Sequence, residues 1–490
     1  MLKIISKDLT KERVETLVIP VCEDNVIHDG RQVAALVRAA GKMAEFSGGK
    51  KQKITFFSPK GIQADRVVFI GMGKKAGLDR EALRAAAGRG VRVALAGKLN
   101  RICFLAPSEK KAGLGLGDIL TSLMEGAFLA NDVLGTYKKE KQKQPLKEIV
   151  MLAPTGREKE FSALTKRVTA TCGGTLLARQ WVNMPANLKP PAAFADEIVR
   201  HADREKLKTT VMDDKALKRK KFGAMLAVGA GSASKPRLVI LEYAPVKKAR
   251  KTVVLVGKGV VFDSGGINLK PSASLDTMKT DMAGAAAVAA TLIATARLKP
   301  DVRVVGVMPL VENMPSGRAL RPGDIITSHS GKTIEVGNTD AEGRLILADA
   351  MSWAVKTFKP DVMVDVATLT GACVMALGQK IAGVFSRDAG LSQALAAAAE
   401  KTFERCWLMP MPDDYKELMK SELADINNMS STRYGGAITA ALFLSEFSGN
   451  VPWAHIDIAG PARNGNTPDY CPKGGSGFGV RLLSDMLGRI

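Results

Sequence analysis

Several near-continuous apolar runs limit the fold of this chain more than any other sequence feature. Four of them lie in its C-terminal two-thirds: Leu238–Leu241, Val253–Val256, Val302–Val307 and Val362–Val366. A strand that is apolar at almost every position is buried on both faces, as in a parallel or mixed sheet covered by helices. Ala-rich helical stretches separate the runs, so their alternation predicts an α/β fold.

The first part of the chain shows the same alternation. Residues 16–22, 66–72, 101–105 and 148–152 are typical of strands, and residues 31–44, 80–97 and 116–136 are typical of helices. A chain of 490 residues is too long for one ordinary core. We therefore predict an N-terminal α/β domain at 1–160, a connecting helix at 161–182, and a larger C-terminal α/β domain at 183–490 with a mixed, largely parallel sheet. The helix should end at Asn183-Met184-Pro185, because the residue before a proline disfavours helix.

Bulk properties narrow the class of protein. No apolar N-terminal stretch with a small-residue cleavage site is present, and no later run of about 18 apolar residues is expected to span a bilayer, so we expect a cytoplasmic protein. The six cysteines lie far apart without C-x-x-C spacing and are expected to be reduced thiols. The net charge of +22 is unusual and clusters in three basic runs: Lys138–Lys143, Lys218–Lys221 and Lys247–Lys251.

Acidic residues gather where these strands end. Lys258 and Asp263 occupy a Gly-rich turn after Val253–Val256, outside the carboxyl end of a strand, where open α/β sheets place ligands. Asp281 is expected to open an Ala-rich helix, where a helix cap is the simpler explanation for it alone. Asp340, Glu342 and Arg344 should project to one side of an extended segment. A surface salt-bridge ladder is the simpler explanation for this last triplet, although apolar segments flank it.

Taken together, the acidic residues predict a metal site. Four carboxylates in one crevice, from Asp263, Asp281, Asp340 and Glu342, are too costly unless cations compensate them. Two divalent ions would balance the charge, and oxygen ligands suit zinc, manganese or magnesium. Lysine also becomes a ligand when an ion displaces its proton, because its pKa shifts readily. Residue types and spacing thus predict a carboxylate-rich metal site with hydrolytic chemistry.

Competing motifs have little support in this sequence. Gly229–Ser234 is close to a dinucleotide-binding fingerprint but lacks its last glycine. No G-x-S-x-G elbow and no H-E-x-x-H motif occurs, and the chain has only four histidines. A serine hydrolase and a histidine-zinc protease are therefore excluded.

The octapeptide Asn338–Leu345 resembles the signature of the leucyl aminopeptidase family, the cytosol aminopeptidases. The stretch Gly257–Lys270, with Phe262-Asp263-Ser264-Gly265-Gly266, resembles the second hallmark of that family, and Asp281 lies where a further metal ligand is expected. Asp365–Ala372 and His455–Gly460 also look like family segments. The resemblance covers most of residues 180–490. Over residues 1–160 it is limited to the layout of the chain and includes no sequence motif.

The resemblance implies a two-metal exopeptidase that releases N-terminal residues, often leucine, from peptides with a free N-terminus. Asp263, Asp340 and Glu342 would bind the first ion, and the second ion, which also receives the substrate amine, would have four ligands: Lys258, Asp263, Asp281 and Glu342. Lys270 would stabilise the oxyanion, and Arg344 would hold a bicarbonate that acts as general base. The side-chain pocket would be lined by Met278, Thr368, Gly371, Ala459 and Ala462. A homohexamer is implied in the same way.

A nucleic-acid-binding protein is the alternative from a different class. The basic runs would attract phosphate, and some members of the resembled family bind DNA. No DNA- or RNA-reading motif is visible, and the complete set of ligand residues favours an enzyme. We therefore treat DNA binding as a possible second role, carried by the basic runs outside the metal crevice.

Overall fold

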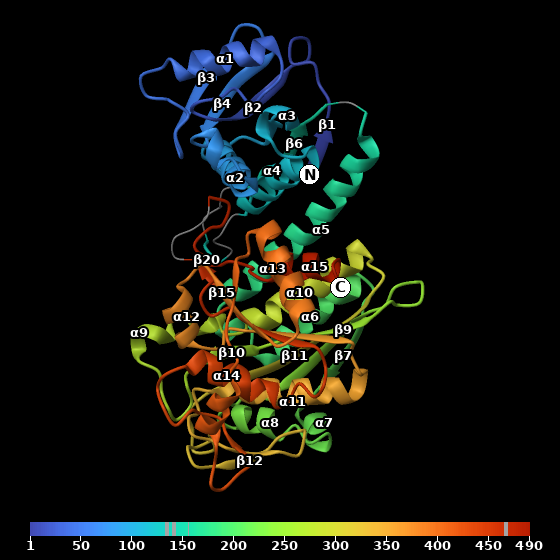
Figure 1. The fold of residues 1–490 in the computed structure, drawn as a ribbon, viewed down its shortest axis with the longest axis vertical. Helices are drawn as coiled ribbons and strands as arrows, with labels where there is room; N and C mark the ends of the chain where they lie inside the picture. The colour runs from blue at the N-terminus through green and yellow to red at the C-terminus, as the bar shows by residue number, and fades with distance from the viewer. Residues whose placement is uncertain (133–136, 140–143, 155, 465–468) are drawn as a thin grey trace. The chain divides into compact units, whose positions relative to one another are not determined.

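The computed structural model describes residues 1–132, 137–139, 144–154, 156–464 and 469–490 (Figure 1). The chain divides into two units. The smaller comprises Met1–Gly173 with Gly465–Lys473, and the larger comprises Gly174–Asn464 with Gly474–Ile490. Each unit has its own sheet, as the alternation of apolar runs and helical stretches predicted.

A six-stranded sheet in the order β1-β6-β5-β2-β4-β3 forms the centre of the smaller unit. Its strands are β1 (Leu2–Ile5), β2 (Val14–Val21), β3 (Lys53–Phe57), β4 (Ala64–Gly71), β5 (Arg101–Leu105) and β6 (Glu148–Leu152). Neighbouring strands are parallel except at the edge, where β3 runs antiparallel to β4. The helices are α1 (Arg31–Gly41), α2 (Arg80–Ala96), α3 (Glu109–Ala112) and α4 (Leu116–Ala130), with a 3₁₀ turn η1 (Lys75–Gly77). The helix predicted over 116–136 thus ends at Ala130, and its last residues, 133–136, lie outside the described ones.

Helix α5 (Glu158–Asn183) runs from the smaller unit into the larger one. Its end is bound by a buried lysine. The ammonium of Lys189 donates to the carbonyl oxygens of Trp181 at 2.8 Å and Val182 at 3.4 Å. Burial, together with the charge of Lys279, lowers the pKa of Lys189 to about 7. This lysine therefore satisfies carbonyl groups that the last turn of a helix leaves without intrahelical donors.

The larger unit is built on a nine-stranded sheet. Its order is β16-β15-β18-β14-β9-β11-β8-β7, and β10 pairs with β11. The strands are β7 (Lys208–Met212), β8 (Arg237–Tyr243), β9 (Thr252–Gly257), β10 (Gly259–Asp263), β11 (Arg303–Asn313), β14 (Val362–Ala367), β15 (Ala382–Ser386), β16 (Cys406–Leu408) and β18 (Trp453–Asp457). The central pairs β9–β11, β9–β14 and β14–β18 are parallel, whereas β7–β8, β8–β11 and β15–β18 are antiparallel. The predicted mixed, largely parallel sheet is confirmed.

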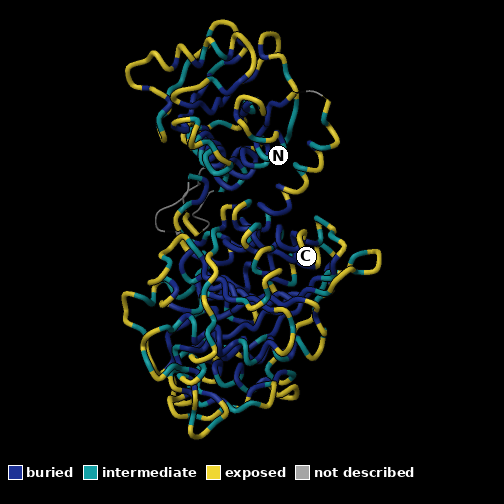
Figure 2. The backbone as a smooth tube through the Cα atoms, in the orientation of Figure 1, coloured by how far each residue is buried: buried dark blue, intermediate teal, exposed yellow. Residues whose placement is uncertain are grey.

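Helices cover both faces of this sheet, which is why its strands are apolar at nearly every position (Figures 1 and 2). One face packs against α6 (Pro191–Arg204), α10 (Ala283–Leu298), α13 (Ala389–Thr402) and α15 (Val480–Leu487). The other face packs against α7 (Asp214–Arg219), α8 (Gly223–Val228), α11 (Glu342–Phe358) and α14 (Gly436–Ser445). The site described below lies where several of these strands and helices begin or end.

Helical segment Ser272–Leu298 corrects one expectation from the sequence. By length and composition alone it is apolar enough to cross a membrane, but 83% of its apolar window is buried inside the fold, as in the core helix of a globular domain. The six cysteines carry free thiols, as predicted, and five of them are buried.

Smaller elements complete the larger unit. They are the strands β12 (Ile325–Thr327), β13 (Thr333–Glu335), β17 (Ile426–Asn427), β19 (Arg463–Asn464) and β20 (Gly474–Gly475), the helices α9 (Ser272–Leu275) and α12 (Gly371–Leu377), and the 3₁₀ turns η2 (Ala186–Leu188), η3 (Gly229–Gly231), η4 (Met278–Thr280) and η5 (Asp413–Met419). Strand β13 pairs with β12 and, in parallel, with β17. This pairing brings the chain after β17 beside the loop that connects β13 to α11.

Candidate active site

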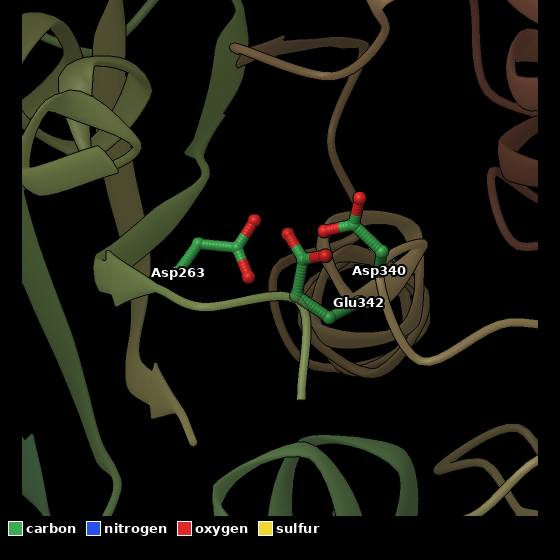
Figure 3. Close-up of side chains that lie close together, drawn as sticks. All are labelled: Asp263, Asp340 and Glu342. Carbon is green, nitrogen blue, oxygen red and sulfur yellow. The ribbon is translucent and has the colours of Figure 1, made fainter. Parts of the chain in front are cut away.

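Three carboxylates from separate elements meet in the larger unit. Asp263 is the last residue of β10, Asp340 lies in the loop before α11, and Glu342 is the first residue of α11. One oxygen from each lies within 4.8 Å of the other two, and Figure 3 shows the three groups turned toward one another. Asp263 and Glu342 are buried, so their mutual repulsion is poorly screened by water.

Two lysines contact these carboxylates. Lys258, between β9 and β10, has its Nζ atom 2.8 Å from Glu342 Oε1 and 2.9 Å from Asp281 Oδ2. Lys270, in the loop after β10, has its Nζ atom 2.9 Å from Asp263 Oδ2 and also contacts Asp340 Oδ1. The sequence-predicted Lys258, Asp263, Lys270, Asp281, Asp340 and Glu342 therefore lie in one cluster.

Burial and charge act in opposite directions on the lysines. Burial alone would lower the pKa of Lys258, but the nearby charges of Asp281, Glu342 and Asp263 outweigh it and raise that pKa above its usual value. The pKa of Lys270 is raised in the same way, mainly by Asp263 and Glu342 against burial. Both ammonium groups are therefore held by the carboxylates when no other cation is near.

Among the acids, burial dominates. It raises the pKa of Asp281 to about 6 and that of Glu342 to about 8, with the charge of Asp263 adding to both shifts. Lys258 opposes each shift but does not cancel it. Two lysines are thus too little positive charge for this cluster, which favours binding of a further cation.

Several carboxylate oxygens of the cluster lack hydrogen-bond donors, which shows whether the site suits divalent ions. Asp281 Oδ2, Asp340 Oδ1 and both carboxylate oxygens of Glu342 are buried and receive no hydrogen bond of acceptable geometry. Three of these four contact a lysine at ion-pair distance, whereas Glu342 Oε2 has no lysine within that distance among the described residues. Buried oxygens without donors are costly, and metal coordination would satisfy them. The residues present therefore fit a carboxylate-bound divalent metal centre.

A glycine makes the contact between Lys258 and Glu342 sterically possible. A Cβ atom at Gly343 would lie 2.7 Å from both Cε and Nζ of Lys258. Any larger residue at this position would displace the lysine from the site.

Two expectations about local structure were wrong. Asp281 does not open the Ala-rich helix, since it follows η4 and α10 begins at Ala283. Its carboxylate instead accepts a hydrogen bond from Thr368 Oγ1 at 2.6 Å. Glu342 and Arg344 are not in an extended segment either, because α11 begins at Glu342. Side chains in a helix do not alternate with period 2, so the predicted clustering of Asp340, Glu342 and Arg344 on one side had the wrong geometric reason.

Arg344 lies in the first turn of α11 and is buried. Its NH1 group donates to the backbone carbonyl oxygen of Asn428 at 2.8 Å, and its Nε atom has no acceptor among the described residues. Burial lowers the pKa of Arg344 to about 10, against the opposing charges of Glu342 and Asp457. A buried guanidinium with unused donors is suited to binding a small anion.

The residues predicted to line a side-chain pocket lie on several elements. Met278 begins η4, Thr368 follows β14, and Gly371 begins α12, where an added Cβ would meet nothing within 4 Å. Ala459 is half-buried after β18, whereas Ala462 is buried in the apolar cluster on the α10 face of the sheet. The carbonyl oxygen of Thr368 accepts a hydrogen bond from Lys258 at 2.9 Å. The backbone carbonyl oxygen of Met278 accepts a hydrogen bond from the backbone NH of Asp281 at 3.3 Å, so two of these five residues contact the lysine–carboxylate cluster through hydrogen bonds.

Sequence reasoning missed two asparagine side chains that hold Asp263 and the residue before Asp340. Asn313, at the end of β11, donates to Asp263 Oδ1 at 2.9 Å and to the carbonyl oxygen of Thr339 at 3.1 Å. Asn268 Oδ1 accepts from the backbone NH of Thr339 at 2.9 Å. Single asparagines in loops have no recognisable spacing, although Asn313 at the end of a buried strand was a signal that could have been used.

The fold and this cluster together define a hydrolase of the metal-dependent α/β class. A family model for the catalytic domain of the cytosol aminopeptidase family matches residues 176–484, and the model for the N-terminal domain of the same family matches residues 19–141. The chain belongs to the cytosol aminopeptidase family. It is a metal-dependent aminopeptidase, a hydrolase that acts on peptides.

Curated relatives agree with this assignment. A probable cytosol aminopeptidase of Syntrophotalea carbinolica is 46% identical over 446 residues, covering 90% of this chain and 89% of the relative. A second, from Streptomyces coelicolor, is 44% identical over 474 residues, covering 93% and 89%. These names do not mention nucleic acid, and the DNA-binding alternative gains no support. Among the basic runs proposed to bind DNA, the residues of Lys218–Lys221 are exposed at the end of α7 and just after it. In the run Lys138–Lys143, residues 140–143 lie outside the described ones.

Solved structures extend the similarity to the whole fold. The manganese complex of the bottromycin maturation enzyme BotP matches with a TM-score of 0.85 and 37% identity, covering 96% of this chain and 98% of that one. A mutant of tomato leucine aminopeptidase matches with a TM-score of 0.88 and 31% identity, covering 100% and 96%.

Proposed function

We propose that this enzyme removes N-terminal residues, with a preference for leucine-type side chains, at a centre holding two divalent ions. The observation that carries the proposal is the buried cluster of four carboxylates and two lysines with oxygens that lack hydrogen-bond donors. The leucine preference is suggested by the similarity to tomato leucine aminopeptidase. Manganese is the first ion to test, since a manganese complex is known for BotP, with zinc and magnesium as alternatives.

We infer the ligand sets from the family resemblance, and the contacts in the cluster support them. Asp263, Asp340 and Glu342, which already converge, would hold the first ion. Lys258, Asp263, Asp281 and Glu342 would hold the second, with Lys258 as a neutral amine once its proton is displaced. Bound in this way, two divalent ions polarise a carbonyl group and lower the pKa of a water molecule. Asp263 and Glu342, common to both sets, would fix the separation of the ions.

Two cationic side chains would act on the substrate. Lys270 contacts Asp263 and Asp340 and, released from them by the ions, would donate a hydrogen bond to the developing oxyanion. Arg344 would use its free donors to hold bicarbonate, which would accept a proton from the attacking water. The open space at Gly371, with Met278, Thr368, Ala459 and Ala462, would accept the substrate side chain.

We further propose that the protein works as a cytoplasmic homohexamer in which residues 161–182 connect an N-terminal domain, 1–160, to a catalytic domain, 183–490. These statements rest on the family resemblance and on relatives named cytosol aminopeptidases. Light scattering after size-exclusion chromatography would test the number of subunits.

A free substrate amine is the requirement that separates an aminopeptidase from an endopeptidase. Metal-stripped protein, reloaded with Mn²⁺ or Zn²⁺, should release leucine from Leu-amide and Leu-Gly-Gly, and methionine and arginine amides should react more slowly. N-acetylated Leu-Gly-Gly should be inert, because its nitrogen no longer coordinates an ion. Cleavage of the acetylated peptide at a comparable rate would contradict the proposal.

A further inference from the structure

Asn428 follows β17 in the chain and is fully buried, although it lies outside the family segments named above. Its neighbours are the residues between β13 and α11, some 90 positions earlier in the chain. This loop carries Asp340 and leads directly into Glu342.

The carboxamide of Asn428 spans that loop. Its Oδ1 atom accepts hydrogen bonds from the backbone NH groups of Gly337 at 2.7 Å and Asn338 at 3.2 Å. Its Nδ2 group donates to the backbone carbonyl oxygens of Asn338 at 2.8 Å and Ala341 at 3.4 Å. The groups it contacts therefore lie on both sides of Asp340 in the sequence.

Only an amide has the donors and acceptors for this arrangement. A carboxamide offers two donor hydrogens and two acceptor lone pairs, and Asn428 uses all four. An aspartate has the same shape but would lose both donors and place a negative charge beside two carbonyl oxygens. An alanine would remove the side-chain partner of four backbone groups in this loop.

The backbone of Asn428 also forms hydrogen bonds with residues in and next to the site. Its carbonyl oxygen accepts the hydrogen bond from Arg344 NH1, and its NH group donates to the carbonyl oxygen of Glu335 at 3.0 Å. The latter contact ties Asn428 to β13, the strand that precedes the loop. One residue thus holds the Asp340 loop through its side chain and Arg344 through its backbone.

We propose that Asn428 is a positioning residue that sets the place of Asp340 and so the affinity of the centre for divalent ions. This inference rests on the proposed function, since it takes Asp340 as a ligand. Changes to residues that orient metal ligands typically weaken metal binding by about 10–100-fold. Because the backbone carbonyl of residue 428 survives any substitution, its contact with Arg344 is retained.

The test compares Asn428→Asp with wild type by titrating Mn²⁺ into metal-stripped protein and following free Mn²⁺ by electron paramagnetic resonance. We expect Mn²⁺ to bind about 10–100-fold more weakly to the variant. At saturating Mn²⁺, kcat should return to within a few-fold of wild type and KM should be unchanged, because the substrate contacts are intact. Weaker Mn²⁺ binding with nearly normal kcat and KM would indicate a misplaced metal ligand, whereas a general loss of structure would also lower kcat at saturating Mn²⁺.

Asn131→Asp is the matched control. The carboxamide of Asn131, in the smaller unit, donates to the carbonyl oxygen of Leu146 at 3.0 Å and accepts from its NH group at 2.7 Å. This substitution should lower the melting temperature without changing Mn²⁺ affinity. A drop in Mn²⁺ affinity as large as that of Asn428→Asp would overturn the proposal. It would show that losing the carboxamide of an asparagine anywhere in the protein weakens the site.

Hydrogen exchange in metal-free wild type provides a measurement that does not depend on a variant folding. The amide hydrogens of Gly337 and Asn338 should be protected, since Asn428 accepts both. Exchange at the rate of an open loop would overturn the proposal. Equal Mn²⁺ affinity of wild type and Asn428→Asp would also overturn it while leaving the proposed function in place, whereas tight Mn²⁺ binding by Glu342→Ala would overturn both.

Discussion

Replacing Glu342 by glutamine should stabilise the metal-free protein and abolish its response to divalent ions. The Glu342 carboxylate is 1% exposed, and burial with the charge of Asp263 raises its pKa to about 8. Glutamine has the shape of the protonated carboxyl group and needs no proton. The variant therefore avoids the free energy that the wild type spends in keeping Glu342 neutral.

The raised pKa gives the size and the sign of the effect. In the folded protein Glu342 keeps its proton between its usual pKa of 4.5 and about 8, whereas in the unfolded chain it loses it. Wild-type stability therefore falls as the pH rises through this window, by about 1.4 kcal/mol per unit. At pH 7 the variant should be more stable than metal-free wild type by about 3 kcal/mol. For a unit of this size that is a rise in melting temperature of about 2–5 °C.

Calorimetry of the metal-stripped wild type and variant at pH 5.5 and pH 7, with and without Mn²⁺, measures this difference in melting temperature. The control is Glu446→Gln. Burial alone would raise the pKa of Glu446, but ion pairs with Lys332 at 2.6 Å and Lys416 at 3.0 Å hold it below its usual value. That substitution should lower the melting temperature with and without metal. A Glu342→Gln protein that melts below metal-free wild type at pH 7, or that Mn²⁺ stabilises as much as wild type, would refute the reasoning.

Two further predictions concern lysines. Lys270→Ala should keep both ions, measured by elemental analysis, while kcat falls by about 10²–10³, the usual effect of losing one oxyanion donor; loss of the metal would show that Lys270 has a different role. Lys189→Met should remove a pH dependence of the free energy of unfolding. The pKa of Lys189 is lowered to about 7, so above that pH the folded protein binds fewer protons than the unfolded chain. The stability of wild type relative to this variant should rise by about 1.4 kcal/mol per pH unit between pH 7 and 10 in denaturant titrations, and a constant difference would contradict the lowered pKa.

Hydrophobic patterning was enough to predict the scaffold. The run Val253–Val256 lies within β9, and Val362–Val366 lies within β14, each covered by helices on both faces. The edge strands were harder to recognise. Strand β7 is largely exposed or half-buried at the sheet edge, and β3 likewise, so neither has a continuous apolar run. Strand direction depends on long-range pairing, which local sequence does not encode.

The candidate site was predicted as a set of residues but not as a geometry. Sequence motifs identified Lys258, Asp263 and Glu342, and the structure brings them together. The start of α11 at Glu342 and the end of η4 before Asp281 depend on tertiary contacts such as that between Lys258 and the carbonyl oxygen of Thr368. Asn428 could not be found from the sequence, because its contacts with residues 337–341 exist only once β13 and β17 pair.

The arrangement of two ions on shared carboxylates is the central claim, and anomalous diffraction tests it most directly. Crystals loaded with Mn²⁺ should show two anomalous peaks in each subunit, about 3.5–4 Å apart. Carboxylate oxygens of Asp263 and Glu342 should lie within bonding distance of both peaks, Asp340 should contact one, and Lys258 and Asp281 the other. A single peak, or two peaks that share neither Asp263 nor Glu342, would contradict the account.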